Sequence, residues 1–307
     1  MPSIEERIQQ TLPTFAPGGS LLRTWPLKGG ISASMTAFEI NHVNGSTQKY
    51  IARQPGEWSY NRDPKAAHTE FQVLRALREA GLPVPNPIAV EPSQSPDIHE
   101  FFIIEYTEGE ARAFADDPQS YIQAFAKILA HIHQTPWQGS ALADLPRLSD
   151  NPYRSSDESK VLIPIEEVIY RALDSYPSIS SPNGQVLNHG DYWPGNILWQ
   201  SDQIVSVIDW EGARIGDPFM DLSIARLDIL WILGPEAMDE MTAIYQAETN
   251  FDLSTLNYWD LRICLRPIGE FERMAPAYPH LGRADITAEF MSQQHEWFVA
   301  QALSRRL

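Results

Sequence analysis

The stretch of sequence that decides the fold is HGDYWPGN at residues 189–196, and VIDW at residues 207–210 follows it after a short apolar run. Asp191 lies five residues before Asn196, and Asp209 comes directly after the apolar run. In phosphoryl transfer from a nucleotide, one carboxylate orients the acceptor hydroxyl, while a side-chain oxygen and a second carboxylate hold magnesium. The three side chains therefore indicate a site that handles phosphate.

The residues between Asn196 and Asp209 predict a β-hairpin. ILWQ at 197–200 is typical of a strand, residues 201–203 are typical of a turn, and IVSVI at 204–208 is typical of the return strand. Asn196 and Asp209 lie at equal distances from the hairpin centre near Asp202, so an antiparallel hairpin brings them together at its open end. Both offer hard oxygen ligands, which suit magnesium rather than zinc.

A polar loop beside an ordinary hairpin is the alternative, because Asp, Asn and Gly are common turn residues. Any one of these residues alone favours that alternative. The joint pattern favours a site, since two Asp and one Asn would otherwise have to converge by accident beside apolar strands.

The motif at residues 189–196, with Ile208-Asp209-Trp210, resembles the catalytic and metal-binding motifs of the aminoglycoside phosphotransferase and choline kinase-like superfamily. That superfamily is similar to protein kinases, in which H-R-D-x-x-x-x-N and D-F-G play the same parts. Gly190 stands in place of the kinase Arg and Trp210 in place of the Phe, and both departures favour small-molecule kinases.

The resemblance implies an α+β, bilobed protein kinase-like fold. Residues 1–105 would form a sheet-rich nucleotide-binding lobe, and residues 106–307 a mostly helical lobe with the catalytic loop and the acceptor site. ATP or GTP would donate the phosphoryl group to a hydroxyl of a small molecule. Asp191 would be the catalytic carboxylate, and Asn196 and Asp209 would hold Mg²⁺.

A glycine turn near the start of the chain resembles the nucleotide-covering loop of the superfamily. It contains Gly29, Gly30 and Ser32, and residues of strand character flank it. Backbone N–H groups of such a turn can cover phosphates. An ordinary hairpin turn is the commoner alternative, and no Walker A loop is present, because no G-K-[ST] follows.

Arg53 ends a predicted strand at the position where kinases carry the Lys that holds the α and β phosphates. Arg keeps the charge but has a different reach and geometry. A helix is predicted from Asp63-Pro64 to Gly81, and Glu70 falls on or beside its apolar stripe. A carboxylate that faces a core needs a partner, and Arg53 is the natural one. A surface Arg53 and a rim Glu70 that reaches solvent are the open alternatives.

The apolar strand at 101–106 leads, in the superfamily, to the hinge where backbone groups bind adenine. The resemblance implies that the Glu105 carbonyl and the Thr107 amide make these contacts. It also implies that Asp221 braces the catalytic loop through backbone N–H groups. His133 would pack at the end of its helix, and Asp217 could cap the helix that follows it.

Composition limits the classes of partner. The chain has 307 residues with 43% hydrophobic content, and its net charge of −17 argues against a nucleic-acid partner. No stretch is long and apolar enough to span a membrane, and the N-terminus lacks signal-peptide features. The single cysteine, Cys264, is compatible with a reducing cytoplasm. The acidic segment 236–252 could attract a cationic acceptor, although a solvated helix is the favoured interpretation.

Two other hypotheses remain. One is a catalytically inactive kinase-like protein that binds nucleotide or acts as a scaffold, which Arg53 in place of Lys favours and the presence of Asp191, Asn196 and Asp209 disfavours. The other is a protein kinase, which the missing A-P-E segment disfavours. The resemblance leaves the acceptor open among aminoglycosides, macrolides, choline-like amines, amino alcohols and sugars.

Overall fold

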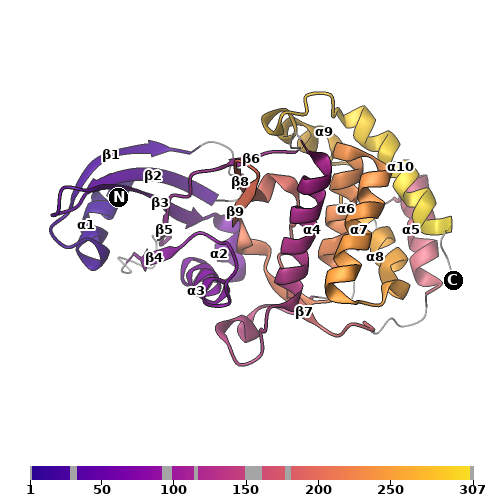
Figure 1. Ribbon diagram of the computed structural model, residues 1–307, viewed down its shortest axis with the longest axis horizontal. Helices are drawn as coiled ribbons and strands as arrows, with labels where there is room; N and C mark the ends of the chain where they lie inside the picture. Colours follow the sequence, from indigo (N-terminus) through magenta and orange to yellow (C-terminus); the bar gives the residue numbers. More distant parts are fainter. Residues whose placement is uncertain are drawn as a thin grey trace. The chain divides into compact units, whose positions relative to one another are not determined.

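The chain divides into two compact units, Met1–Glu108 and Gly109–Leu307, where we expected a division near residue 105. A computed structural model describes residues 2–27, 33–91, 99–113, 117–148, 161–176 and 181–304 (Figure 1). Among the helices of these ranges, none combines the length and the apolar character that crossing a bilayer requires.

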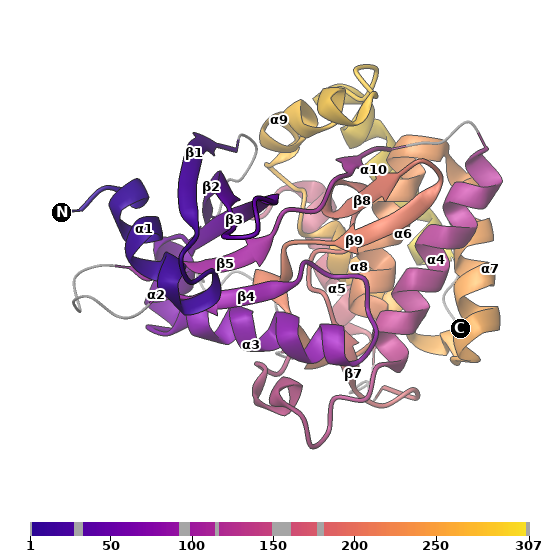
Figure 2. The ribbon, with the colours of Figure 1, turned by 60° about the vertical axis from the view of Figure 1, so that its left-hand side comes forward.

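A five-stranded antiparallel sheet forms the centre of the first unit (Figures 1 and 2). In spatial order its strands are β1 (Ser20–Pro26), β2 (Ala33–Asn41), β3 (Thr47–Pro55), β5 (Phe102–Glu105) and β4 (Pro87–Val90). The helices of this unit are α1 (Ile4–Phe15), α2 (Glu57–Arg62) and α3 (Ala66–Glu79). Ser3 and Glu6 form a capping box at the start of α1.

The two faces of the sheet receive different helices. Ile8 and Leu12 of α1 belong to one apolar cluster with Tyr50 and Ala52 of β3. Successive side chains of a strand point to opposite faces, so Arg53 lies on the other face, against which α3 packs. This alternation directs Arg53 toward α3.

The predicted helix at 63–81 begins later than expected. Its observed start is Ala66, after Lys65 as N-cap. The carboxylate of Asp63 does not cap the helix and instead accepts hydrogen bonds from the Lys65 N–H at 2.8 Å and the Thr69 hydroxyl at 2.5 Å. Gly81 follows the helix with φ +86°, as its predicted role as a stop requires. The short helix α2 was not predicted.

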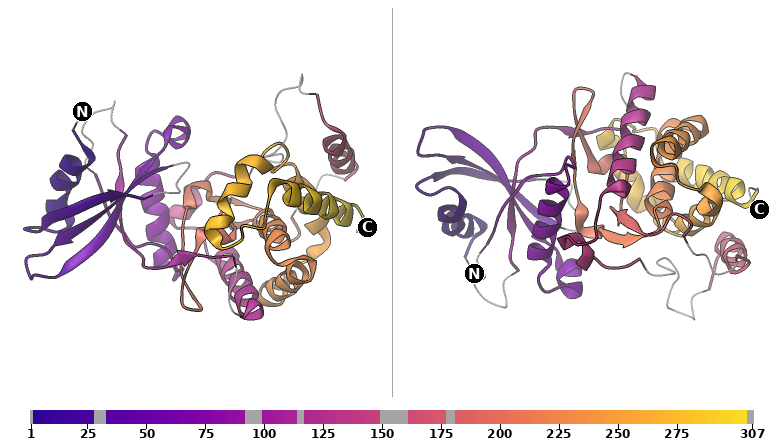
Figure 3. Two further views of the ribbon diagram at one scale, coloured as in Figure 1. Left: turned by 90° about the horizontal axis from the view of Figure 1, so that it is seen from above. Right: turned by 60° about the horizontal axis from the view of Figure 1, so that its bottom comes forward.

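The second unit is largely helical (Figures 1 and 3). Its α-helices are α4 (Pro118–Gln134), α5 (Pro164–Asp174), α6 (Phe219–Leu233), α7 (Pro235–Thr249), α8 (Leu256–Cys264), α9 (Phe271–Met274) and α10 (Ala288–Ser304). Two small antiparallel sheets accompany them. One has the order β6 (Glu110–Ala111), β8 (Ile197–Gln200), β9 (Gln203–Val207), and the other pairs β10 (Arg214–Gly216) with β7 (Val186–Asn188).

Helix α6 is buried on all sides between α7, α8 and α10. Apolar side chains occur on every side of it, as a central helix requires. Arg226 on α6 and Asp260 on α8 form an ion pair at 3.0 Å, and both side chains are fully buried. Arg226 also donates to the Thr242 hydroxyl on α7 at 2.5 Å. A charge at this depth is tolerated because each donor has a partner.

Candidate catalytic site

The loop at residues 189–196 follows β7 and passes very close to the segment after Asp209. Gly190 has φ +89°, and a Cβ added there would lie 2.2 Å from the carbonyl oxygen of Gly212. The position occupied by Arg in protein kinases therefore admits only glycine here. Asp209 itself has a left-handed backbone, with φ 66° and ψ 60°. Non-glycine residues adopt that conformation rarely, and often at functional sites.

Asp221, in the first turn of α6, holds the start of this loop. Its carboxylate accepts hydrogen bonds from the backbone N–H of His189 at 2.5 Å and of Gly190 at 2.9 Å. These are the expected bonds to backbone N–H groups. His133, at the end of α4, donates to the same carboxylate at 3.4 Å and has Tyr245 on its other ring nitrogen at 2.6 Å.

The charge of Asp221 is stabilised although the residue is fully buried. Burial acts to raise the pKa of this carboxyl, but the hydrogen bond and charge of His133, together with His189 and the Gly190 N–H, outweigh burial. The pKa is thus held below its ordinary value, and the carboxylate stays ionised to bind the loop.

His189 joins the catalytic loop to the segment that carries Asp209, a role that we did not predict. Its Nδ1 accepts from the Asp191 N–H at 3.3 Å, and its Nε2 donates to the Ile208 carbonyl at 2.9 Å. The ring also packs on Trp210 with centroids 4.6 Å apart. The imidazole is fully buried, so it connects the backbones next to both acids.

The predicted hairpin is present, and it brings Asn196 to the strand end before Asp209. Ile197 pairs with Val207, and the Ile208 N–H donates to the Asn196 carbonyl at 2.9 Å. The Asn196 Nδ2 donates to the backbone oxygen of Asp191 at 2.9 Å. This bond fixes the orientation of the Asn196 side-chain amide. Because Nδ2 is the donor in this bond, Oδ1 is the atom suited to bind a cation.

Asn196 and Asp209 carry oxygen donors of the kind that magnesium takes. Within the described ranges, no group of three or more His, Cys, Asp or Glu side chains is arranged to hold a metal. Magnesium is commonly bound through one or two protein oxygens, with phosphates and water completing its shell. Asn196 offers one amide oxygen and Asp209 offers one carboxylate, which is a set of protein ligands of this kind.

Arg266, just after α8, was missed by the sequence analysis. Its Nη2 donates to Oδ1 of Asp191 in an ion pair. The other oxygen of Asp191 faces the Asn196 Nδ2 at 3.4 Å. The proposed catalytic carboxylate is thus approached from two sides.

Asp228, on α6, is a second acid that we did not predict. It is buried and accepts a hydrogen bond from the Tyr278 hydroxyl at 2.7 Å. Burial raises the pKa of Asp228 to about 7, while the Tyr278 hydrogen bond and the Arg266 charge act to lower it, and Asp191 acts to raise it. Two acidic side chains therefore act electrostatically on each other and on Arg266.

The residues predicted to bind nucleotide belong to the first unit. Arg53 Nε and Glu70 Oε2 are 2.8 Å apart, and each side chain is only 10% exposed. This excludes the alternatives of a surface arginine and a rim glutamate. Gly29, Gly30 and Ser32 lie outside the described residues.

The predicted hinge contacts are backbone groups. The Glu105 side chain accepts hydrogen bonds from Gln48 at 3.1 Å and Asn86 at 3.3 Å, and the Tyr106 N–H donates to the Lys49 carbonyl at 3.2 Å. These bonds fix the strand end that precedes Thr107.

The acidic segment 236–252 includes most of α7, and two of its side chains have partners on α4. Glu248 lies 3.6 Å from Lys127 of α4, and Glu240 accepts from Gln119 of α4 at 3.2 Å. The solvated-helix interpretation fits these exposed contacts.

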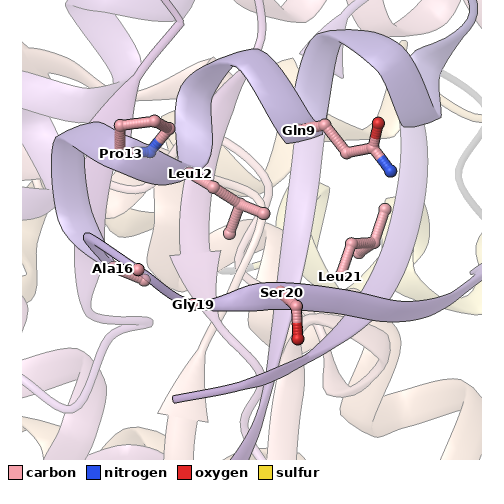
Figure 4. Close-up of a pocket in the computed structure, with 8 residues that line it drawn as sticks. Gln9, Leu12, Pro13, Ala16, Gly19, Ser20 and Leu21 are labelled. Carbon is pink, nitrogen blue, oxygen red and sulfur yellow. The ribbon is translucent and has the colours of Figure 1, made fainter. Parts of the chain in front are cut away.

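A cavity of about 300 Å³ lies between α1 and β1 in the first unit (Figure 4). Gln9 and Leu12 line it from the helix, and Gly19, Ser20 and Leu21 line it from the following segment. None of the predicted site residues belongs to this cavity.

Comparisons with known proteins identify the family of this chain. A family model described as "Phosphotransferase enzyme family" matches residues 26–259. Among curated proteins, acyl-CoA dehydrogenase family member 10 of Mus musculus is 25% identical over 220 residues, and member 11 of Rattus norvegicus is 24% identical over 247 residues. The matches cover 63% and 75% of this chain but only 20% and 31% of those proteins.

Solved structures share the fold over almost the whole chain. A putative aminoglycoside phosphotransferase from Ralstonia eutropha superimposes with a TM-score of 0.65 at 18% identity, covering 95% of this chain and 98% of that one. A macrolide 2′-phosphotransferase from Brachybacterium faecium gives 0.64 at 17% identity, covering 99% of each chain. The kinase-like α+β fold and the superfamily resemblance inferred from residues 189–196 are confirmed.

Proposed function

Because the chain belongs to the phosphotransferase enzyme family, we propose that it transfers the γ-phosphoryl group of ATP or GTP to a hydroxyl group of a small molecule. The observation that carries this proposal is the hydrogen-bonded connection of Asp191, Asn196 and the segment before Asp209. A chain retained only as a scaffold would not need the loop of Asp191 and Asn196 bonded to the backbone that leads into Asp209.

Asp191 is the carboxylate that orients the acceptor hydroxyl and accepts its proton. In loose phosphoryl transfer, catalysis rests mainly on positioning and on neutralising charge. Asp221 and His189 support Asp191 by fixing the backbone on both sides of Gly190. The loop is therefore organised before substrate arrives.

Asn196 Oδ1 and the Asp209 carboxylate would hold Mg²⁺. When bound, the ion neutralises charge on the nucleotide phosphates. The left-handed backbone of Asp209 supports this assignment, because an unusual conformation is maintained there by the hydrogen bonds of its neighbours.

Residues 1–105 constitute the nucleotide lobe in this proposal, and residues 106–307 the acceptor lobe. Arg53 holds the donor phosphates while Glu70 fixes its guanidinium at 2.8 Å. Gly29, Gly30 and Ser32 cover the phosphates with backbone N–H groups. The carbonyl of Glu105 and the amide of Thr107 bind the base.

The acceptor is a small hydroxylated molecule, with cationic amines as one class to test. The net charge of −17 supports such an acceptor over a nucleic acid. The buried single cysteine, Cys264, supports a cytoplasmic location. The curated relatives bear the name acyl-CoA dehydrogenase, so hydroxylated acyl-CoA thioesters belong among the candidate acceptors beside aminoglycosides, macrolides, amino alcohols and sugars.

The decisive experiment measures ADP or GDP formation with magnesium over this panel of acceptors. We expect at least one acceptor to raise the rate in the wild-type protein, and the Asp191→Ala variant to remain at background. Full activity in a folded Asp191→Ala variant would contradict the role of Asp191. Nucleotide binding without turnover over the whole panel would favour the inactive, scaffold-like alternative.

A further inference from the structure

Arg266 reaches the catalytic loop from a distant part of the chain. It lies 75 residues after Asp191 in the sequence, and its Nη2 donates to Asp191 Oδ1. The backbone that presents it is restrained, because the Arg266 N–H donates to the Ile263 carbonyl at 2.9 Å and Pro267 follows. A guanidinium is therefore delivered to the proposed catalytic carboxylate from a fixed turn.

The alternative is that Arg266 and Asp191 form an ordinary surface ion pair, because exposed pairs contribute little to the stability of the fold. The surroundings of Arg266 argue against it. The two side chains are only 30% and 35% exposed. The positive charge of Arg266 also acts on the buried carboxyl of Asp228, lowering its pKa against the effect of burial. Arg266 thus lies within the electrostatic reach of two acids, one of them deep in α6.

The two oxygens of Asp191 have different donors. Oδ1 accepts from Arg266, while Oδ2 faces the Asn196 Nδ2 at 3.4 Å, a distance at which a hydrogen bond is weak. Donors on both oxygens restrict rotation of the carboxylate about χ2. The more weakly held oxygen, Oδ2, is the one available to an acceptor hydroxyl.

We propose that Arg266 is a positioning residue that holds the Asp191 carboxylate so that Oδ2 meets the acceptor hydroxyl. The inference rests on the proposed phosphotransferase function. Misplacing a reacting group by about 1 Å can cost on the order of a hundredfold in rate. Holding the Asp191 carboxylate in its reactive orientation is therefore enough to explain the ion pair with Arg266.

A guanidinium suits this role better than an ammonium group. It is planar, carries its donors in a rigid fork and matches a carboxylate, whereas the Lys ammonium is a compact charge on a flexible stem. Lysine at position 266 should restore the charge but only part of the orientation.

The test compares Arg266→Gln and Arg266→Lys with wild type and with a matched control, Arg273→Gln. Arg273 lies on the same C-terminal segment and pairs with Glu270, but its side chain is 64% exposed. ADP formation is measured with the best acceptor of the panel. We expect Arg266→Gln to lower kcat about 10- to 100-fold with the nucleotide KM within about twofold. Arg266→Lys should recover part of this loss, and Arg273→Gln should match wild type.

Each Arg266 variant is also made in an Asp191→Asn background. Because Arg266 acts through Asp191, Arg266→Gln should there lower kcat by less than about twofold. An equal loss in both backgrounds, or a raised nucleotide KM, overturns the inference and indicates a direct contact with nucleotide. If the Asp191→Asn rate lies below detection, a Lys variant no better than the Gln variant overturns it.

Failure of the inference differs from failure of the proposed function. Absence of ADP formation in wild type above the Asp191→Ala background contradicts the function itself. An active wild type, an inactive Asp191→Ala variant and an unchanged Arg266→Gln variant leave the function in place and overturn the role of Arg266. Circular dichroism melts of all variants exclude unfolding as the cause.

Discussion

A Cβ on Gly190 would lie 2.2 Å from the carbonyl oxygen of Gly212. The two glycines thus fix the distance between the loop that carries Asp191 and the segment that follows Asp209. The Gly212 carbonyl belongs to the backbone and cannot move aside as the end of a flexible side chain can.

Gly190→Ala tests that contact. Its matched control is Gly139→Ala, because Gly139 also has a positive φ, +76°, but a Cβ there would meet nothing within 4 Å. The control should lose about 1–2 kcal/mol of unfolding free energy from backbone strain alone. Gly190→Ala should lose more than the control and also lower kcat at least about tenfold. Denaturant unfolding and turnover measure the two effects, and equal losses of stability in the two variants would contradict the contact.

Asp209→Asn separates the charge of this residue from its backbone conformation. Asn tolerates the left-handed region in which Asp209 lies, at φ 66°. We therefore expect the unfolding free energy to change by less than about 0.5 kcal/mol, while kcat falls by about a hundredfold or more because a proposed magnesium ligand loses its charge. In a titration with Mg²⁺, the variant should need a higher magnesium concentration than wild type to reach half of its maximal activity. Normal turnover at low magnesium would rule out the ligand role.

The raised pKa of Asp228 predicts a pH dependence of stability. Its folded pKa of about 7 exceeds the ordinary value near 3.9. The folded state therefore binds the proton more readily, and stability from this group is present below about pH 4 and is lost as pH rises through 7. The full difference is on the order of 4 kcal/mol at 1.4 kcal/mol per pKa unit.

Asp228→Asn should remove this dependence while keeping an acceptor for the Tyr278 hydroxyl. The variant should be more stable than wild type at pH 8 and lose that advantage at pH 5. Chemical denaturation at both values checks the sign. Asp202→Asn, at a side chain that is 81% exposed, should show no such change.

The Arg53–Glu70 pair can be removed in two ways. Arg53→Ala leaves a buried carboxylate unpaired and should cost about 3–5 kcal/mol of unfolding free energy, together with a raised nucleotide KM. The double variant Arg53→Met, Glu70→Leu removes both charges and should recover most of the stability. Its nucleotide KM should stay raised, because the guanidinium of Arg53, which would hold the phosphates, is gone. Recovery of the KM in the double variant would show that Arg53 acts on folding alone.

The hairpin and its open end could be predicted from the sequence because the signals are local. Residues 197–208 show strand character on both sides of a polar turn, which predicts the hairpin. Counting from its centre misses the register by one residue, because a bulge between Leu198 and Trp199 shifts the pairing and Asn196 bonds Ile208. The bonds from Asp221 to the loop required the family resemblance, since no local pattern relates residues 31 and 32 positions apart.

Arg266 and Asp228 escaped prediction for different physical reasons. Arg266 meets Asp191 only through the packing of α8, and nothing near residue 266 indicates it. Asp228 did leave a signal, because it is an acid directly before the apolar run 229–233 of α6 and a buried acid needs a partner. The later start of α3 shows that a side chain able to cap a helix can instead bond the turn before the helix and a side chain within it.

The β8–β9 hairpin has a further consequence for changes in chain length. Its tip, Ser201 and Asp202, is exposed, and Arg112 bonds both residues at the surface. Residues inserted at the tip would lengthen a loop that points away from Asn196 and leave the open end unchanged. One residue inserted within either strand would turn every later side chain to the opposite face. The tip is thus the place for a peptide tag or a fluorescent label. Inserting or deleting one residue within either strand, in contrast, should abolish activity.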